Sequence, residues 1–283
     1  MKRLFTAVLA SVSVFSLLYT VPVKAEANMV PDYEMKFLID SDKVLNSDEQ
    51  LKSEYRDFFN TGKTYETVGV LYIETPEYDF SDQGWNNRIR IKEDSDNFEL
   101  TYKKRYSIEN GDIDSALSLA NSEGFDISDT NYEAQVDWGY AKMTLSLSNK
   151  KKEPNKGYDE LELPKKDDAI EILKDRMPGK LENWQGKNWG KDTLENGKKC
   201  GPVYYSKYAG NISGIDIDIE IWPVYSKTED STEYITEVSF KEDTYREALE
   251  NRQIVMDALE SNTIMLHEDS LKTQKILDAY LKS

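Results

Sequence analysis

Charged residues alternate with apolar ones in several short stretches of this sequence, and the charges are of both signs. Successive side chains of a β-strand point to opposite faces of the sheet, so each set of charges lies on one face and its apolar neighbours lie on the other. If such a sheet closes into a barrel with the ionic faces inward, its interior becomes a pocket for a highly charged ligand. The alternating charges are Asp32, Glu34 and Lys36; Arg88 and Arg90; Lys103 and Arg105; and Asp216, Asp218 and Glu220.

The beginning of the chain has the pattern of a secretory signal. Lys2 and Arg3 precede a long apolar run, and small residues follow at Ala25 and Ala27, where a peptidase could cut. We therefore expect residues 1–27 to be removed and the mature protein to be secreted or extracytoplasmic, without stable membrane insertion. Because the apolar run is long enough to span a bilayer, an uncleaved anchor is the alternative.

Composition argues against several classes of partner and site. With 36 Lys and Arg against 53 Asp and Glu, the formal net charge is −17. Such an acidic surface argues against nucleic acid and anionic membranes as partners. The single cysteine, Cys200, and the single histidine, His267, exclude an intrachain disulfide and zinc sites rich in His or Cys. We expect His267 on the surface of a C-terminal helix, and any chemistry to use carboxylates, Lys, Arg and a metal ion.

Periodicity predicts a mainly antiparallel β-protein of the α+β class, with about eight strands and with helices packed outside the sheet. The rest of the mature chain, residues 28–283, is expected to form one domain. A stretch rich in Gly, Asn, Lys and Trp at 179–201 is expected to be a loop, whose Trp184 and Trp189 could stack on a ligand or cover the barrel mouth. Strands are predicted at 32–40, 64–75, 86–93, 97–106, 131–148, 202–209, 214–225 and 233–241, and helices at 46–60, 112–123, 166–176 and, in two segments, 244–281.

The first predicted strand carries a pair of carboxylates that could bind a metal ion. Asp32 and Glu34 lie two residues apart and share a face, within reach of one cation. Mg²⁺ or Mn²⁺ prefers oxygen ligands and commonly completes its shell with water and substrate phosphate, which Lys36 on the same face would then contact. The alternative is an ordinary exposed face of an acidic protein, and for this triplet alone it is the favoured one.

The basic strands are harder to explain as solvated surface. Arg88 and Arg90 share a face, as do Lys103 and Arg105, and the short turn between the two strands predicts a hairpin. Four cations side by side destabilise a sheet unless an anion lies between them. A solvated basic patch is the alternative, but the chain as a whole is strongly acidic.

The last strands supply further candidates. Glu237 and Lys241 share a face and could add a metal ligand and a phosphate contact to those of the acidic strand at 216–220. The alternative for that acidic strand is a solvent-facing edge strand whose charges prevent pairing with other chains. Other residues that could face the same interior are Glu133, Lys199 and Lys207.

Taken together, these stretches resemble the CYTH superfamily, also called triphosphate tunnel metalloenzymes. The hallmark of that family is a strand with the pattern acidic-x-acidic-x-Lys, which Asp32, Glu34 and Lys36 match with Asp in the place usually held by Glu. The resemblance continues through R-I-R, L-T-Y-K-K-R, I-D-I-E-I-W and Y-I-T-E-V-S-F-K. It implies an eight-stranded antiparallel β-barrel that forms a tunnel with a charged interior.

The resemblance also implies a role for each candidate residue. Glu34 and Lys36 would be catalytic. Mg²⁺ or Mn²⁺ would be coordinated by Asp32, Glu34 and Glu237, with Asp218 or Glu220. A triphosphate would be neutralised by Lys36, Arg88, Arg90, Lys103, Arg105, Lys207 and Lys241.

Members of that family include inorganic, thiamine and RNA triphosphatases, polyphosphate polymerases and class IV adenylyl cyclases. Export disfavours cyclisation of nucleotides, because ATP is scarce outside cells, and it also disfavours capping of RNA. The resemblance therefore implies a metal-dependent phosphohydrolase acting on inorganic triphosphate, polyphosphate, or a nucleoside or thiamine triphosphate. The alternative is a non-catalytic exported barrel that binds a phosphorylated or polyanionic ligand, since a fold does not dictate an activity.

Overall fold

The computed structural model describes residues 26–226, 230–269 and 272–282. The predicted signal falls almost entirely on residues 1–25, which lie outside these ranges. Within them, no helix is both long enough and apolar enough to cross a membrane. Export and cleavage of a signal therefore stay predictions.

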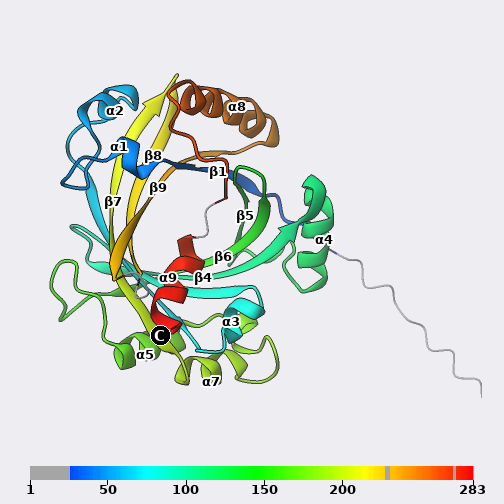
Figure 1. The fold of residues 1–283 in the computed structure, drawn as a ribbon. Helices are drawn as coiled ribbons and strands as arrows, with labels where there is room; N and C mark the ends of the chain where they lie inside the picture. The colour runs from blue at the N-terminus through cyan, green and yellow to red at the C-terminus, as the bar shows by residue number, and fades with distance from the viewer. Residues whose placement is uncertain (1–25, 227–229, 270–271, 283) are drawn as a thin grey trace, which may run out of the picture.

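Among the described residues, nine strands form one closed barrel (Figure 1). The order around the barrel is β1-β5-β6-β4-β3-β2-β7-β8-β9, and β9 pairs with β1 to close it. All neighbours are antiparallel except β1 and β5, which are parallel. The strands are β1 Asp32–Ile39, β2 Glu66–Glu74, β3 Trp85–Lys92, β4 Asn97–Ile108, β5 Glu133–Trp138, β6 Met143–Pro154, β7 Lys198–Ile212, β8 Ile215–Ser226 and β9 Ser231–Glu242.

The predicted closed, mainly antiparallel barrel is confirmed, with one more strand than expected. The stretch predicted as a single strand at 131–148 is a hairpin of β5 and β6. Its turn is closed by the amide of Gly139, which donates a hydrogen bond to the carbonyl of Lys142 at 2.8 Å. This turn lets β5 pair with β6 on one side and, in parallel, with β1 on the other.

The helices lie mostly around the barrel (Figure 1). The predicted helices at 112–123 and 166–176 and the two C-terminal segments are confirmed, whereas only a short part of 46–60 is helical. The predicted loop at 179–201 is wrong, since it holds two helices and the start of β7. The helices are α1 Ser41–Val44, α2 Ser53–Phe58, α3 Asp79–Asp82, α4 Ile113–Ser122, α5 Lys166–Arg176, α6 Gly179–Glu182, α7 Trp189–Glu195, α8 Tyr245–Ser261 and α9 Lys272–Leu281, with a 3₁₀ turn at Glu109–Gly111.

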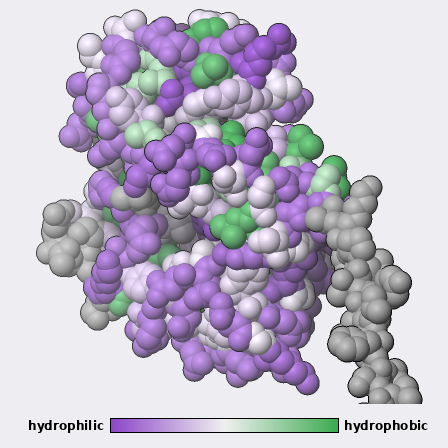
Figure 2. Space-filling model, turned by 90° about the vertical axis from the view of Figure 1, so that its right-hand side faces the viewer, coloured by the Kyte–Doolittle hydropathy of each residue, from purple (hydrophilic) through white to green (hydrophobic). Residues whose placement is uncertain are grey.

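The outer face of the barrel forms the larger apolar core. Met35 on β1, Ile89 on β3 and Ile219 on β8 are fully buried, each one residue away from a charged neighbour that points the other way. They belong to the same apolar cluster as residues of the covering helices, such as Leu173 of α5 and Val255 of α8. Burial of this face, which the alternation predicts, directs the charged face inward. Away from this core, the face shown in Figure 2 is mostly hydrophilic, with scattered hydrophobic side chains.

The inward face changes character along the barrel. At one end, which we call the apolar end, the inward side chains are hydrophobic and pack against α9. At the other, the ionic end, they are charged. The apolar end consists of Leu38, Val68, Val70, Tyr72, Cys200, Val203, Tyr205, Trp222, Val224 and Ile235, together with Ile276, Leu277 and Leu281 of α9. One end of the barrel interior is therefore filled by hydrophobic packing, and the ionic end is left as the candidate site.

Candidate functional site

A cavity of about 250 Å³ lies inside the barrel. Eight Lys and Arg side chains line it against five Asp and Glu, so it is net positive within a protein of net charge −17. The charged lining residues are Asp32, Glu34, Lys36, Arg88, Arg90, Lys103, Arg105, Glu133, Lys150, Glu220, Glu237, Lys241 and Lys272. Most of the predicted site residues therefore come together around one space, although they are spread over more than two hundred residues of sequence.

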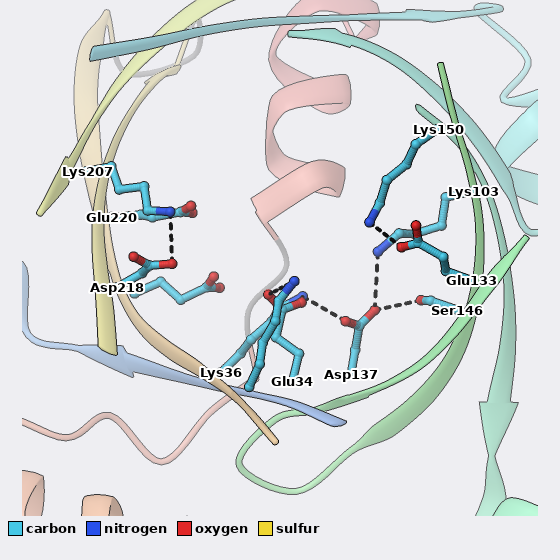
Figure 3. Close-up of polar contacts among 12 residues, drawn as sticks. Glu34, Lys36, Lys103, Glu133, Asp137, Ser146, Lys150, Lys207, Asp218 and Glu220 are labelled. Atoms are coloured by element: carbon cyan, nitrogen blue, oxygen red, sulfur yellow. Dashed lines mark hydrogen bonds and ion pairs between the residues drawn. The ribbon is translucent and has the colours of Figure 1, made fainter. Parts of the chain in front are cut away.

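Lys36 lies at the centre of an ion-pair network on the floor of the cavity (Figure 3). Its Nζ is 2.7 Å from Glu34 Oε2 and 2.8 Å from Asp137 Oδ1. Burial by itself lowers the pKa of Lys36. The nearby carboxylates of Asp137 and Glu34 outweigh this effect and raise the pKa above its ordinary value. Lys36 therefore stays protonated at any physiological pH and is held in a fixed place.

Asp137 is a buried acid that sequence reasoning missed. Parallel pairing of β5 with β1 places it beside Glu34. Besides Lys36, it accepts a hydrogen bond from Ser146 Oγ at 2.6 Å and lies 3.7 Å from Lys103 Nζ. Burial by itself raises the pKa of Asp137. The positive charges of Lys103 and Lys36 outweigh this effect and hold the pKa well below its usual range. The alternation E-A-Q-V-D-W contains the signal that points Asp137 inward with Glu133.

Cations on β3 and β4 form the opposite wall, and two of them have no ion-pair partner among the described residues. Arg88 donates to Thr101 Oγ1 at 3.3 Å, but its buried Nε has no hydrogen-bond partner in that part of the chain. Arg105 likewise forms no ion pair with a described carboxylate; burial lowers its pKa, and the charge of Asp137 opposes this. Burial lowers the pKa of Lys103 to about 7; Asp137 opposes this, and Lys36 adds to it.

Arg90 differs from these neighbours because it already has an acidic partner. Its Nε donates to Glu99 Oε2 at 2.9 Å, across the β3–β4 hairpin. Lys92 lies 3.5 Å from the other oxygen of Glu99. The positive charge of Arg90 is thus partly compensated within the wall, whereas Arg88 and Arg105 present theirs to the cavity.

A second acidic pair lies on β8 and β9. Glu220 and Glu237 are register partners on these two strands, and both line the cavity. Lys272, the first residue of α9, reaches them with its Nζ 2.8 Å from Glu220 Oε2 and 3.0 Å from Glu237 Oε1. Burial by itself raises the pKa of Glu220, but the positive charge of Lys272 outweighs this and lowers the pKa to about 2. No periodic signal in the sequence pointed to Lys272.

Two predicted site residues, Lys207 and Asp218, are not part of the cavity lining. Their side chains point into the barrel from β7 and β8 and pair with each other at 2.9 Å (Figure 3). Asp216 accepts a hydrogen bond from the side chain of Asn211 at 2.8 Å instead of facing the cavity. Lys199 donates to the carbonyl of Pro164 at 3.2 Å and is likewise absent from the lining.

The remaining candidates have other surroundings. Glu133 pairs with Lys150 on the cavity wall (Figure 3). Trp184 packs edge-on against Trp85 with ring centroids 5.5 Å apart, and Trp189 packs in the same way against Phe80 at 5.4 Å. Both tryptophans therefore belong to apolar packing, and neither lines the cavity.

His267 is exposed, as predicted, but it is not part of a helix. It lies between α8 and α9, with its ring stacked on Tyr140 at 5.0 Å between centroids. Its Nε2 is 2.5 Å from Glu260 Oε1. It does not line the cavity.

The carboxylates fit a divalent ion at one place and not at another. Within the described ranges, no cluster of three or more His, Cys, Asp or Glu is arranged to hold a metal. Mg²⁺ is often bound by one or two carboxylates that share it with substrate phosphate, and Asp32 and Glu34 on the cavity wall suit this arrangement. At this pair Lys36 and Lys241 contact Glu34, but Asp32 has no ion-pair partner within the described ranges and stays available to a metal ion. At Glu220 and Glu237, by contrast, the Lys272 ammonium lies against both carboxylates.

The comparisons with known proteins found similar solved structures. No family model matches this sequence, and no curated protein matches it. A candidate adenylyl cyclase from Hippeastrum, described as having a dominant triphosphatase activity, is 12% identical, with 87% of this chain and 95% of that chain covered and a TM-score of 0.48. A candidate adenylate cyclase from Bacillus halodurans is 12% identical, with 89% and 98% covered and a TM-score of 0.49.

A third similar structure is a candidate adenylate cyclase from Vibrio parahaemolyticus. It is 9% identical, with 88% of this chain and 99% of that chain covered and a TM-score of 0.41. Similarities this distant carry no conclusion about activity. The closed barrel is established by the strand pairing of the chain itself.

Proposed function

We propose that this protein is an exported phosphohydrolase that cleaves inorganic triphosphate, polyphosphate, or a nucleoside or thiamine triphosphate with the help of Mg²⁺ or Mn²⁺. The observation that carries the proposal is a net-positive cavity, enclosed in a strongly acidic protein, with cations that lack acidic partners in the described chain. Like charges on neighbouring strands destabilise a sheet unless an anion compensates them. A small polyanion is the ligand that such a wall favours.

The wall of β3 and β4 would bind the phosphate chain. Arg guanidinium groups match the geometry of phosphate oxygens and make charge-assisted hydrogen bonds to them. The unpartnered Nε of Arg88 supplies one such donor, and Arg105 and Lys103 supply others beside it. Lys241 and Lys150 would extend the contact toward the rim. A chain of several phosphates is favoured because the cations are spread along the cavity.

The floor of the cavity would orient the reacting phosphate. Asp137 and Glu34 hold Lys36 at 2.8 and 2.7 Å, so its ammonium is already in place before a substrate arrives. Such preorganisation removes the cost of reorganisation during the reaction. Asp32 and Glu34 are the residues that would hold a divalent ion, which when bound would offset charge on phosphate oxygens. In hydrolysis a water oxygen bonds to the terminal phosphorus, the bridging P–O bond breaks, and the proton of the water is released.

The experiment is a substrate panel on the full chain without its predicted signal. Phosphate release from tripolyphosphate, polyphosphate, ATP and thiamine triphosphate is measured with Mg²⁺ and with Mn²⁺. We expect metal-dependent release from at least one of them. In parallel, thermal unfolding is followed with and without tripolyphosphate, because a bound ligand stabilises the folded state by mass action.

One observation favours a second candidate function, a non-catalytic barrel that binds a polyanion. Two of the predicted metal ligands, Glu220 and Glu237, already form ion pairs with Lys272. A protein of this kind would show a higher melting temperature with tripolyphosphate but no phosphate release with any metal. If tripolyphosphate with Mg²⁺ does not raise the melting temperature at all, both functions are excluded and the charged faces are structural.

A further inference from the structure

The pair Glu220 and Glu237 already holds a cation that comes from the chain itself. The Lys272 ammonium contacts one oxygen of each carboxylate, at 2.8 and 3.0 Å. Its side chain is 17% exposed, and those of Glu220 and Glu237 are 16% and 2% exposed. Two carboxylates brought together in a barrel interior need a positive charge between them, since burial of unpaired charge is costly. Lys272 supplies that charge.

The ammonium is held by more than its two acidic partners. It lies 4.3 Å from the centroid of the Trp222 ring, an arrangement that attracts a cation to the aromatic face. Trp222 Nε1 in turn donates to Glu220 Oε2 at 2.9 Å, which fixes the carboxylate that Lys272 contacts. The ammonium is therefore bound by aromatic and acidic groups of two strands, which together form a preorganised cation site.

The apolar end of the barrel positions α9 (Figure 1). Lys272 is the first residue of this helix. Ile276, Leu277 and Leu281 are buried among the inward hydrophobic side chains at that end. Farther along the helix, the hydroxyl of Tyr78 donates to Asp278 Oδ1 at 2.7 Å. Because the helix is anchored in this way, its first residue is directed at the acidic pair.

One carboxylate oxygen of the pair is left without a partner. Glu237 Oε2 is buried and has no hydrogen-bond partner in the part of the chain that the structure describes. Buried polar atoms almost always have a hydrogen-bond partner, so this oxygen is an acceptor that the single ammonium of Lys272 leaves unbound. The pair has the capacity for a cation of higher charge than the one it holds.

We propose that Lys272 takes the place of a divalent cation at Glu220 and Glu237, and that this pair is a latent Mg²⁺ or Mn²⁺ site kept closed by α9. An ammonium and a divalent ion cannot share these oxygens, because both would lie within about 3 Å of them and would repel each other. In the native protein, Glu220 and Glu237 are therefore closed to a metal ion. This inference concerns cation binding and is independent of whether the protein hydrolyses triphosphates.

The test is a titration of the full chain, without its predicted signal, with Mn²⁺, followed by electron paramagnetic resonance and calorimetry. Lys272→Met keeps an unbranched side chain that is one atom shorter, and removes its charge. We expect it to bind one more Mn²⁺ than the wild type, and to melt at a higher temperature when Mn²⁺ is added. The matched control is Lys275→Met, on the same helix, whose partner Glu233 is away from the cavity. It should titrate like the wild type.

Two further variants locate the new site. The added equivalent of Mn²⁺ should disappear in Lys272→Met combined with Glu237→Gln. In the wild-type background Glu237→Gln alone should leave Mn²⁺ binding unchanged, a measurement that does not require the Lys272 variant to fold. The inference is overturned if Lys272→Met folds and gains no Mn²⁺, or if Glu237→Gln removes Mn²⁺ from the wild type. Neither outcome bears on the release of phosphate, which is measured separately.

Discussion

The two ends of the barrel interior are built from the same strands and serve opposite purposes. On β1 the inward side chain changes from Lys36 to Leu38, and on β8 it changes from Glu220 to Trp222. At the apolar end, hydrophobic burial stabilises the barrel by roughly 25 cal/mol for each Å² of apolar surface removed from water. At the ionic end, buried charges must find partners or a ligand. Hydrophobic burial at the apolar end stabilises the barrel, and the ionic end keeps charged side chains available for a ligand.

The largest expected effect is a loss of stability when the packing of the apolar end is disrupted. Leu277→Ala removes a side chain of α9 that is 2% exposed, and we expect it to lower the free energy of unfolding by about 2–5 kcal/mol. The control is Leu249→Ala on α8, which is 49% exposed and should change stability by less than about 0.5 kcal/mol. Denaturant unfolding of both variants gives the comparison. Equal effects would show that α9 does not close the barrel end.

The next effect concerns the floor of the ionic end. Glu34→Gln keeps the shape of the side chain but removes one negative charge from the expected metal site and from Lys36. We expect kcat for metal-dependent hydrolysis to fall by about a hundredfold or more, with little change in the unfolding free energy. Glu153→Gln, whose ion pair with Arg176 lies outside the cavity, is the control. A rate unchanged by Glu34→Gln would remove Glu34 from the catalytic residues.

A smaller effect separates the cations that have acidic partners from those that do not. Arg88→Gln removes a charge without an acidic partner in the described structure, and we expect a loss of roughly 1.5–3 kcal/mol in tripolyphosphate binding. The stability of the ligand-free protein should stay the same or rise, because repulsion in the wall falls. The exposed Arg176→Gln should alter neither quantity. Calorimetric titration and thermal melting give both numbers, and a stable variant with undiminished affinity would refute a phosphate contact at Arg88.

The smallest effect is a dependence on pH through Lys103, whose pKa is lowered by burial to about 7. A bound polyanion favours its protonated form, so binding takes up a proton above pH 7. We expect the affinity for tripolyphosphate to fall by up to about tenfold per pH unit between about pH 7 and the ordinary lysine pKa of about 10.4. Lys103→Arg stays protonated and should bind with a much flatter pH profile. Parallel profiles for the two proteins would be evidence against this role.

The same group affects the ligand-free protein with the opposite sign. Because the folded pKa of Lys103 lies below its unfolded value, the unfolded state binds more protons between about pH 7 and about pH 10.4. The contribution of Lys103 to stability therefore rises with pH across this window, and below it the full penalty of the buried charge applies. Thermal melting of wild type and Lys103→Met across the window measures this contribution.

Much of the barrel and part of the site could be predicted from alternation alone. A period of two residues is a local property, so the inward faces of β1, β3 and β4 followed from it directly. The same reasoning directed Glu220 and Glu237 inward, and both line the cavity. The hairpin within 131–148 was missed because its turn, closed by Gly139, interrupts an otherwise regular strand pattern.

The partners of these residues could not be predicted in the same way. Lys36 meets Asp137 across 101 positions of sequence, and Lys272 meets Glu220 across 52. Contacts between distant segments depend on which strands become neighbours and on where a helix is anchored, and neither leaves a local periodic trace. Lys207 and Asp218 show the limit most clearly, since both were candidates for the barrel interior but nothing in the sequence indicated that they pair with each other.

The order of residue types along the chain thus specified which strand faces are charged and which are apolar, whereas closure of the sheet is set by the pairing of β9 with β1. Folding in three dimensions settled which charges are neutralised and which stay available, because electrostatic interactions depend on distances that only the assembled barrel sets. That difference decides the chemistry of the cavity. Arg88 and Arg90 look equivalent in the sequence, but Glu99 is close enough to neutralise only Arg90.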